Sequence, residues 1–317
     1  MADLVTFGES MLRLSTPEGE RLARVDGLDV HVGGAESNVA VAAHHLGLDA
    51  TWLSKLPDTD LGRRIAHEIR SEGVDAAVTW TDEGRAGTYY LERGPKPRGA
   101  NVLYDREDAA IRTAMPDELP LERVREAHTF FTSGITPALS GDLGKTTASL
   151  LSTAREAGAT TVLDANYRSK LWDPDQARAT LTSLFSDVDV LFVAERDAER
   201  VLDATGDAAV VAADLRDRYG FETVVLTRGD AGALAVHGDE TYEQDVFEAD
   251  TVDPVGTGDA FVGGYLASRL QDGSVPDALA YGAATASLKR TLAGDHAVVS
   301  PPEVEAVLDA ETGDISR

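Results

Sequence analysis

The segment DPVGTGDAF, residues 253–261, carries residue types that phosphoryl transfer requires. Gly256, Thr257 and Gly258 come just before an apolar run with helical periodicity, so their backbone N–H groups would lie at a helix N-terminus. Such N–H groups, together with the positive end of the helix dipole, bind an anion. Asp259, in the first turn, could accept a proton from an attacking hydroxyl group. A glycine-rich turn followed by an ordinary N-terminal acid has the same pattern, so this segment alone leaves both interpretations open.

Two other segments could contact ligands. In VGGAESNVAVAAHHLG, Gly33 and Gly34 would let the backbone approach a ligand closely, and the Asn38 amide could hold a hydroxyl group. In VVLTRGDAGALAV, a predicted strand ends and a glycine turn leads into another strand; the candidate nucleotide contacts there are Thr227, Gly229 and Gly232. Tight helix packing explains the first segment equally well, and a plain hairpin explains the second.

Alternating strands and helices must position these residues. Short apolar runs typical of buried strands lie at 3–9, 50–54, 128–134, 160–166, 189–195 and 222–229. Helical patterns lie between and after them, at 33–48, 60–73, 141–158, 208–220, 258–273 and 276–294. Alternation of this kind predicts an α/β fold with a doubly wound, mostly parallel, Rossmann-like sheet.

Two stretches interrupt this alternation. Residues 11–33 and about 86–106 contain short alternating strands with turn residues and no helix. We expect them to pair into a small β-sheet that forms a lid on a single domain of residues 1–317.

Composition excludes several classes of function. The net charge is −26, from 29 Lys and Arg against 55 Asp and Glu, and only five of the cations are lysine. Such a chain is a poor candidate for binding nucleic acid or anionic membranes, and we expect neither as a partner. The excess of acidic residues either serves ordinary solubility or is an adaptation to molar salt, which screens the repulsion between the negative charges. We favour the second interpretation, a halophilic protein. There is no cysteine, no apolar run long enough for a membrane span, and no signal-peptide pattern at the start, which predicts a cytoplasmic protein.

In family order and spacing, the early GG…N segment, the TRGDAG loop and the late DPVGTGDAFVGG segment together resemble the ribokinase-like (PfkB) carbohydrate kinases. The resemblance covers essentially the whole chain, the lid included. It implies ATP as donor with Mg²⁺, Asp259 as the base, and Gly256, Thr257 and Gly258 as the anion hole. It also implies that Gly256 and Gly258 contact the nucleotide. A Walker-type GxxxxGK[ST] loop is absent, so the chain does not resemble a P-loop kinase.

The chain departs from the family pattern at one place, and one further site follows from the resemblance. Ala194 and Asp197 stand where the family often has Asn-x-x-Glu, which positions metal and phosphate. This leaves no metal-positioning residue to name. By resemblance, Asp253 would help to form a monovalent cation site for K⁺ beside the anion hole.

Arginines in two regions suggest an anionic substrate. Tyr104 and Arg106 share a face of a predicted lid strand, and Arg168 follows the strand at 160–166, at the sheet edge where doubly wound folds bind ligands. Two guanidinium groups converging on one pocket would suit a carboxylate, although either could instead pair with a nearby acid. Of the adjacent tyrosines, we expect Tyr89 rather than Tyr90 to face the pocket.

In its details the chain is most similar to the 2-keto-3-deoxygluconate kinases, through GESMLRLS, the lid Tyr-x-Arg, NYRSKLW, VDPVG and LKRTLAGDHAVVS. This implies that Gly34, Tyr89, Tyr104, Arg106 and Arg168 contact a keto acid whose terminal hydroxyl points at Asp259. A fructokinase, or another kinase of the family, is the alternative, because fructokinases share a similar pattern. A non-catalytic sugar or nucleotide sensor is a further one, against which the intact Asp259 argues. We also expect a homodimer that pairs through the lid, or a higher homo-oligomer.

Overall fold

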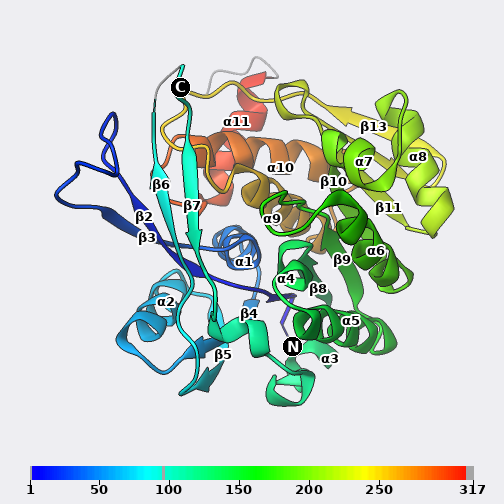
Figure 1. Cartoon of the computed structure of the whole chain (residues 1–317). Coiled ribbons are helices and arrows are strands. Elements are labelled where there is room, and N and C mark those ends of the chain that lie inside the picture. The colour runs from blue at the N-terminus through cyan, green and yellow to red at the C-terminus, as the bar shows by residue number, and fades with distance from the viewer. Residues whose placement is uncertain (1, 95–96, 312–317) are drawn as a thin grey trace.

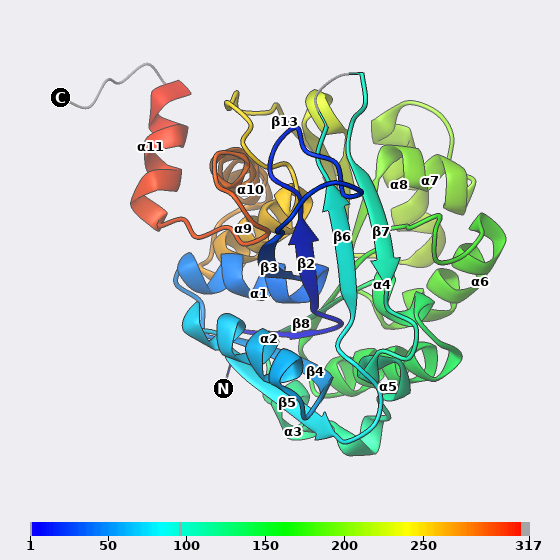
Figure 2. The same ribbon diagram turned by 60° about the vertical axis from the view of Figure 1, so that its left-hand side comes forward.

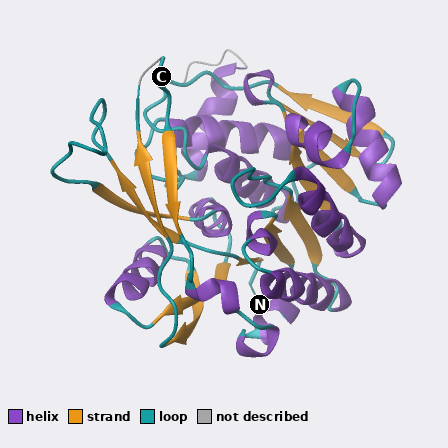
Figure 3. Ribbon diagram, in the orientation of Figure 1, coloured by secondary structure: helices purple, strands orange, loops and turns teal. Residues whose placement is uncertain are grey.

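The computed structural model describes residues 2–94 and 97–311. Residues 95 and 96 of the predicted lid segment 86–106, and residues 1 and 312–317 of the predicted single domain, lie outside the described residues. Most of the chain forms one large twisted sheet with helices on both faces, and a second, smaller sheet stands to one side (Figures 1 and 3).

The large sheet has nine strands in the order β13-β12-β11-β10-β9-β8-β1-β4-β5. All neighbours from β11 to β5 are parallel, whereas β12 and β13 are antiparallel to their neighbours. This confirms the predicted doubly wound, mostly parallel α/β fold. The strands are β1 Leu4–Phe7, β4 Ala50–Pro57, β5 Asp75–Thr81, β8 Thr129–Ser133, β9 Thr160–Asp164, β10 Val190–Ala194, β11 Thr223–Thr227, β12 Ala233–His237 and β13 Glu240–Gln244.

Two helical layers cover this sheet, and alternate strand residues face each layer. Leu4 and Phe192, for example, pack toward α1, α9 and α10, whereas Val5 and Leu191 pack toward the opposite layer. The helices are α1 Ala35–His45, α2 Asp60–Ser71, α3 Leu121–Arg125, α4 Ile135–Ala138, α5 Gly141–Glu156, α6 Pro174–Leu184, α7 Glu195–Leu202, α8 Ala208–Tyr219, α9 Thr257–Leu270, α10 Val275–Arg290 and α11 Pro301–Glu311. No helix in the described ranges is both long and apolar enough to cross a bilayer.

The small sheet has the order β3-β2-β6-β7 and joins the two interrupting stretches through the parallel pair β2 and β6 (Figure 2). Its strands are β2 Met11–Ser15, β3 Asp29–Gly33, β6 Thr88–Glu92 and β7 Asn101–Asp105. On one face, Leu12 and Val32 pack against the core beneath α1 and α2. On the other, Met11, Tyr89 and Leu91 form a separate apolar cluster. One face is therefore anchored, and the other is available to a ligand.

The predicted strands and helices begin and end within four residues of the observed ones, but two strands of the large sheet lack a sequence signal. The edge strand β5, DAAVTWT, is only partly buried and has no continuous apolar run. The opposite edge strand β13, ETYEQ, is polar and largely exposed. Both depend on backbone pairing with an inner neighbour, which an apolar pattern does not reveal.

Leu191→Ala tests how far the central strands stabilise the fold. Leu191 lies in β10 at 0% exposure, so truncation leaves a cavity and should lower the free energy of unfolding by about 2–5 kcal/mol. The matched control is Leu61→Ala in α2, where the side chain is 53% exposed and we expect a change within about 0.5 kcal/mol. Denaturant unfolding followed by circular dichroism at one fixed salt concentration measures both. Equal losses in the two variants would contradict this account of the core.

Candidate active site

A cavity lies at the carboxyl ends of the central strands, between the large sheet and the small one, where doubly wound folds bind ligands. Every residue predicted from the sequence for proton transfer, the anion hole or the substrate lines it. These residues are Gly33, Gly34, Asn38, Tyr89, Tyr104, Arg106, Arg168, Gly256, Thr257, Gly258 and Asp259. Their placement together agrees with the sequence prediction, while their individual roles stay predictions.

A second cavity adjoins the first, and the two share Thr227, Thr257 and Gly258. It is also lined by Gly229 and Gly232 of the predicted nucleotide loop. Gly256, which we also expected to contact the nucleotide, lines only the first cavity. The N-terminus of α9 thus lies where the two cavities meet, so a group could pass from a ligand in one to a ligand in the other.

Asp259 lies in the first turn of α9 and is partly buried. Its Oδ2 accepts a hydrogen bond of 2.6 Å from the amide Nδ2 of Asn38 in α1. Burial raises the pKa of Asp259 to about 6, against the opposing effects of the Asn38 hydrogen bond and the Arg168 charge. A carboxylate with a pKa just below neutrality is ionised at pH 7 yet remains a usable base.

The turn before α9 requires glycine at position 256. Gly256 has φ of 81° and is the N-cap of the helix. A Cβ atom there would lie 2.1 Å from the backbone oxygen of Asp295. This close contact fixes the turn against the loop that follows α10, and thereby sets the direction of the first N–H groups of α9.

The glycines of the early segment serve packing as well as the cavity. A Cβ on Gly34 would lie 1.9 Å from the backbone oxygen of Glu9, and one on Gly33 would lie 2.3 Å from Asp295 Oδ1. The protein itself therefore excludes larger residues at both positions. We expected the Asn38 amide to hold a substrate hydroxyl. In the structure this amide donates a hydrogen bond to Asp259, because α1 brings the Asn38 side chain beside α9.

A second carboxylate, Asp164 at the end of β9, also lines the cavity. Burial first, and then the nearby negative charge of Asp259, raises its pKa to about 7. Its two oxygens accept hydrogen bonds of 3.1 and 3.2 Å from the backbone and side-chain nitrogens of Asn166. Arg168, two residues further on, is exposed, and its side chain forms no hydrogen bond or ion pair with the described residues. Its guanidinium group is therefore available to a ligand.

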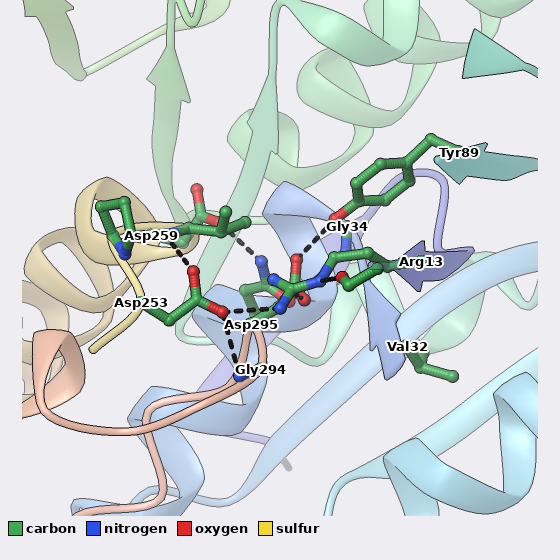
Figure 4. A network of polar contacts seen from close by, with 12 residues as sticks. Arg13, Val32, Gly34, Tyr89, Asp253, Asp259, Gly294 and Asp295 are labelled. Carbon is green, nitrogen blue, oxygen red and sulfur yellow. Dashed lines mark hydrogen bonds and ion pairs between the residues drawn. The ribbon is translucent and has the colours of Figure 1, made fainter. Parts of the chain in front are cut away.

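The small sheet contributes the opposite wall of the cavity. Tyr89 in β6 stands opposite Tyr104 in β7, and the ring centroids are 5.9 Å apart. The Arg106 guanidinium lies over the Tyr104 ring, 5.2 Å from its centroid, as expected for residues on one face. Tyr89 lines the cavity and Tyr90 does not, which agrees with the prediction. The Tyr89 hydroxyl donates to Asp295 Oδ1 at 2.8 Å (Figure 4).

Sequence reasoning missed Glu9, which follows the first strand and lines the cavity. Its Oε2 accepts from Arg106 Nη2 at 2.5 Å, so one of the two predicted substrate arginines is already paired with an acid. Glu9 Oε1 is buried and has no hydrogen-bond partner among the described residues. A buried acceptor of this kind is suited to a ligand hydroxyl. The position of Glu9 at the carboxyl end of a predicted strand was the available signal.

The predicted K⁺ site at Asp253 does not fit the structure. Asp253 is fully buried and lines neither cavity. Its carboxylate is bound by the guanidinium group of Arg13 (Figure 4) and also by that of Arg93. Its backbone oxygen accepts from Lys289 Nζ at 3.0 Å. Protein cations thus occupy the oxygen atoms that a metal ion would need.

Mg²⁺ fits the residues of the cavity better than K⁺ fits those around Asp253, because a small set of oxygen donors lines the cavity. Within the described ranges, no three His, Cys, Asp or Glu side chains cluster in a way that could hold a metal. Mg²⁺ on a nucleotide, however, needs only one or two carboxylates besides phosphates and water. Asp164 and Asp197 both line the first cavity, near Ala194, which lines both cavities. These two carboxylates fit that requirement, and Ala194 supplies no side-chain ligand.

The fold and the two adjoining cavities define a ribokinase-like α/β protein built to bring two ligands together. Residues 1–301 match the model of the pfkB family of carbohydrate kinases, and the chain belongs to that family. It is 58% identical over 316 residues to a 2-dehydro-3-deoxygalactonokinase of Haloferax volcanii, across 100% of this chain and 99% of the relative.

Solved structures agree with this membership. A 2-dehydro-3-deoxygluconokinase from Thermotoga maritima superposes with a TM-score of 0.92 at 34% identity, over 96% of this chain and 98% of that one. A putative Ribokinase II from E. coli, in complex with ATP and Mg²⁺, has the same fold at 18% identity, with a TM-score of 0.88 over 98% of this chain and 100% of its own. The protein is thus a carbohydrate kinase.

The pH dependence of turnover tests the environment of Asp259. The base must be ionised, so kcat/KM should fall as the pH drops through about 6, the raised pKa of Asp259. Asn38→Leu removes the hydrogen bond that lowers the pKa of Asp259, so the pKa should rise and this acidic limb should move to higher pH. Initial rates from pH 5 to 8 at fixed salt measure both limbs. An unshifted limb in the variant would show that the Asn38 hydrogen bond does not set the pKa of Asp259.

Proposed function

We propose that this protein transfers the γ-phosphoryl group of ATP to the terminal hydroxyl of a 2-keto-3-deoxy sugar acid. The observation that carries the proposal is the unpaired Arg168 in the same cavity as the base Asp259. In a chain of net charge −26, a free guanidinium group beside a catalytic carboxylate favours an anionic substrate. The similarity to two kinases of such acids supports the same class.

In this proposal the substrate carboxylate binds Arg168, while Tyr89, Tyr104 and Arg106 line the lid side. Arg106 keeps its contact with Glu9, whose free Oε1 accepts a hydroxyl of the sugar chain. These contacts hold the far end of the substrate and direct its terminal hydroxyl at the α9 N-terminus. Binding energy from the carboxylate thereby orients the reacting oxygen.

The chemical step follows from the residues at the helix N-terminus. Asp259 takes the proton of the hydroxyl group as its oxygen bonds to the γ-phosphorus. The bond from that phosphorus to the oxygen bridging the β- and γ-phosphates breaks, and ADP leaves. The N–H groups of residues 256–258 and the α9 dipole stabilise the negative charge on the group in transfer. Asn38 holds the Asp259 carboxylate in position throughout.

The nucleotide would lie in the second cavity, over Thr227, Gly229 and Gly232 and against α10. Mg²⁺ held by Asp164, Asp197 and the phosphates would neutralise charge on the nucleotide. The small sheet excludes water that would otherwise accept the phosphoryl group.

Two epimers compete for the role of substrate. Sequence analysis names 2-keto-3-deoxygluconate, whereas the relative that is 58% identical is named for the galactonate. The gluconate relative of known structure is only 34% identical. We therefore expect both 2-keto-3-deoxy acids to be phosphorylated, with 2-keto-3-deoxygalactonate preferred over 2-keto-3-deoxygluconate.

The test measures ATP-dependent phosphorylation of both keto acids and of fructose, in molar KCl with Mg²⁺. Asp259→Asn should lower kcat by at least about 10²-fold, because it removes the general base. Arg168→Met should raise KM for the keto acids by about tenfold or more and leave KM for fructose nearly unchanged, because fructose has no carboxylate. Arg63→Met is the matched control, since Arg63 is an exposed arginine paired with Asp58 and lines neither cavity, and it should leave KM for all three sugars unchanged.

Each result assigns the function. Preference for fructose would agree with a sugar kinase but would reject a sugar acid as its substrate. Turnover of none of the three would favour the sensor. Unchanged activity in Asp259→Asn would reject the proposed base.

We also propose that the protein forms a homodimer through its small sheet. β7 is an edge strand of this sheet, and Leu103 on it is 49% exposed. An edge strand with an exposed leucine favours pairing with a second copy. Leu103→Glu should halve the mass measured by light scattering, whereas Leu61→Glu, at an equally exposed leucine on α2, should not. A monomeric wild type would contradict the proposal.

A further inference from the structure

Lys289 is a buried cation whose hydrogen bonds to the described residues all go to backbone oxygens. It lies in the last turn of α10 at 0% exposure, and its Nζ donates to the backbone oxygens of Asp253 at 3.0 Å and Gly294 at 2.8 Å. Burial lowers its pKa to about 8, a shift that the nearby carboxylates of Asp253 and Asp295 oppose. Carbonyl oxygens around a dehydrated cation are also the environment that proteins offer to K⁺.

Arg13 supplies a second cation on the neighbouring carboxylates. It comes from β2 of the small sheet and is also 0% exposed. Its Nη2 bonds to Asp253 Oδ2 at 2.6 Å, and its Nη1 is paired with Asp295 Oδ2 at 2.8 Å. Figure 4 shows the guanidinium group between the two carboxylates. Lys289 thus binds backbone carbonyls of this cluster, whereas Arg13 binds both carboxylates, with Arg93 as a further partner of Asp253.

This cluster fixes the turn that precedes α9. Asp253 Oδ1 accepts from the N–H of Val255 and Oδ2 from the N–H of Gly294, both at 3.1 Å. Gly256 rests on the backbone oxygen of Asp295. The loop 253–256 is thereby joined to the loop 294–295 at two points, and the Val255 bond closes the turn itself. Without positive charge in the cluster, two buried carboxylates would repel each other and separate these loops.

We propose that Lys289, together with Arg13, replaces a monovalent metal ion as the positive charge that orders the anion hole, so that catalysis does not require K⁺. Lys289 is in this sense a positioning residue, because it acts through the backbone of the loop. The inference rests on the phosphoryl transfer proposed above. It corrects the K⁺ site expected from the sequence, since the amino and guanidinium groups already hold the relevant oxygens.

The first experiment uses the wild-type protein and needs no variant. Phosphorylation of the keto acid is measured while KCl is replaced by choline chloride at constant total salt and constant Mg²⁺. Choline is too large for a site of this size, so kcat should stay within about twofold across the series. Activation by K⁺ of about tenfold or more would overturn the proposal.

The second experiment removes the buried cation. Lys289→Ala should lower kcat by about 10²-fold in choline chloride, because the turn loses its position, and K⁺ or NH₄⁺ should restore much of it. Lys145→Ala is the matched control, since Lys145 is a helical lysine whose side chain is 77% exposed, and it should change neither kcat nor the response to salt. Circular dichroism verifies that each variant is folded.

The remaining outcomes are decisive. Two results would overturn the role of Lys289: full activity of Lys289→Ala in choline chloride, or a loss of activity that no monovalent cation restores. If that variant does not fold, the wild-type series in KCl and choline chloride still tests the proposal. Failure of the proposed function looks different, because the keto acids would then not be turned over in KCl either.

Discussion

The position of the α9 N-terminus depends on the neutralisation of two buried carboxylates, Asp253 and Asp295. Both are at most 3% exposed, and each is paired with Arg13. Their hydrogen bonds and the contact of Gly256 with Asp295 determine where the first N–H groups of α9 point. A kinase that works by positioning and electrostatics needs such groups fixed before the substrate arrives, because reorganisation during the reaction costs free energy.

The same cluster connects three parts of the chain that are far apart in sequence. Arg13 comes from the small sheet, Asp253 from the turn before α9, and Asp295 from the loop after α10. Tyr89 extends it to β6 through its hydrogen bond to Asp295. The small sheet is thus attached to the turn before α9 through buried polar contacts, while its outer strand β7 lines the cavity with Tyr104.

Charge is distributed very unevenly between surface and site. The chain has a net charge of −26, yet the cations near the catalytic turn are buried or face the cavity. Within the described chain, Arg13 and Lys289 bind oxygen atoms at the turn before α9, Arg106 is paired with Glu9, and the Arg168 guanidinium forms no hydrogen bond or ion pair. An acidic surface does not prevent binding of an anionic ligand when the nearby charges are positive. Salt screens the distant surface carboxylates, whereas charges that are close together or buried are screened much less.

The sequence by itself determined the alternation of the inner strands with six of the helices, the family and the residues gathered in the cavity, because these follow from local periodicity and from glycine-rich motifs with strict backbone requirements. It did not predict the helices α3, α4, α6, α7 and α11. It did not reveal the edge strands β5 and β13, whose structure comes from pairing rather than from their own apolar pattern. Nor did it show that Asn38 contacts Asp259, that Glu9 pairs with Arg106, or that protein cations hold the oxygens around Asp253. Those facts depend on distances between side chains up to 240 positions apart in sequence, which only tertiary packing decides.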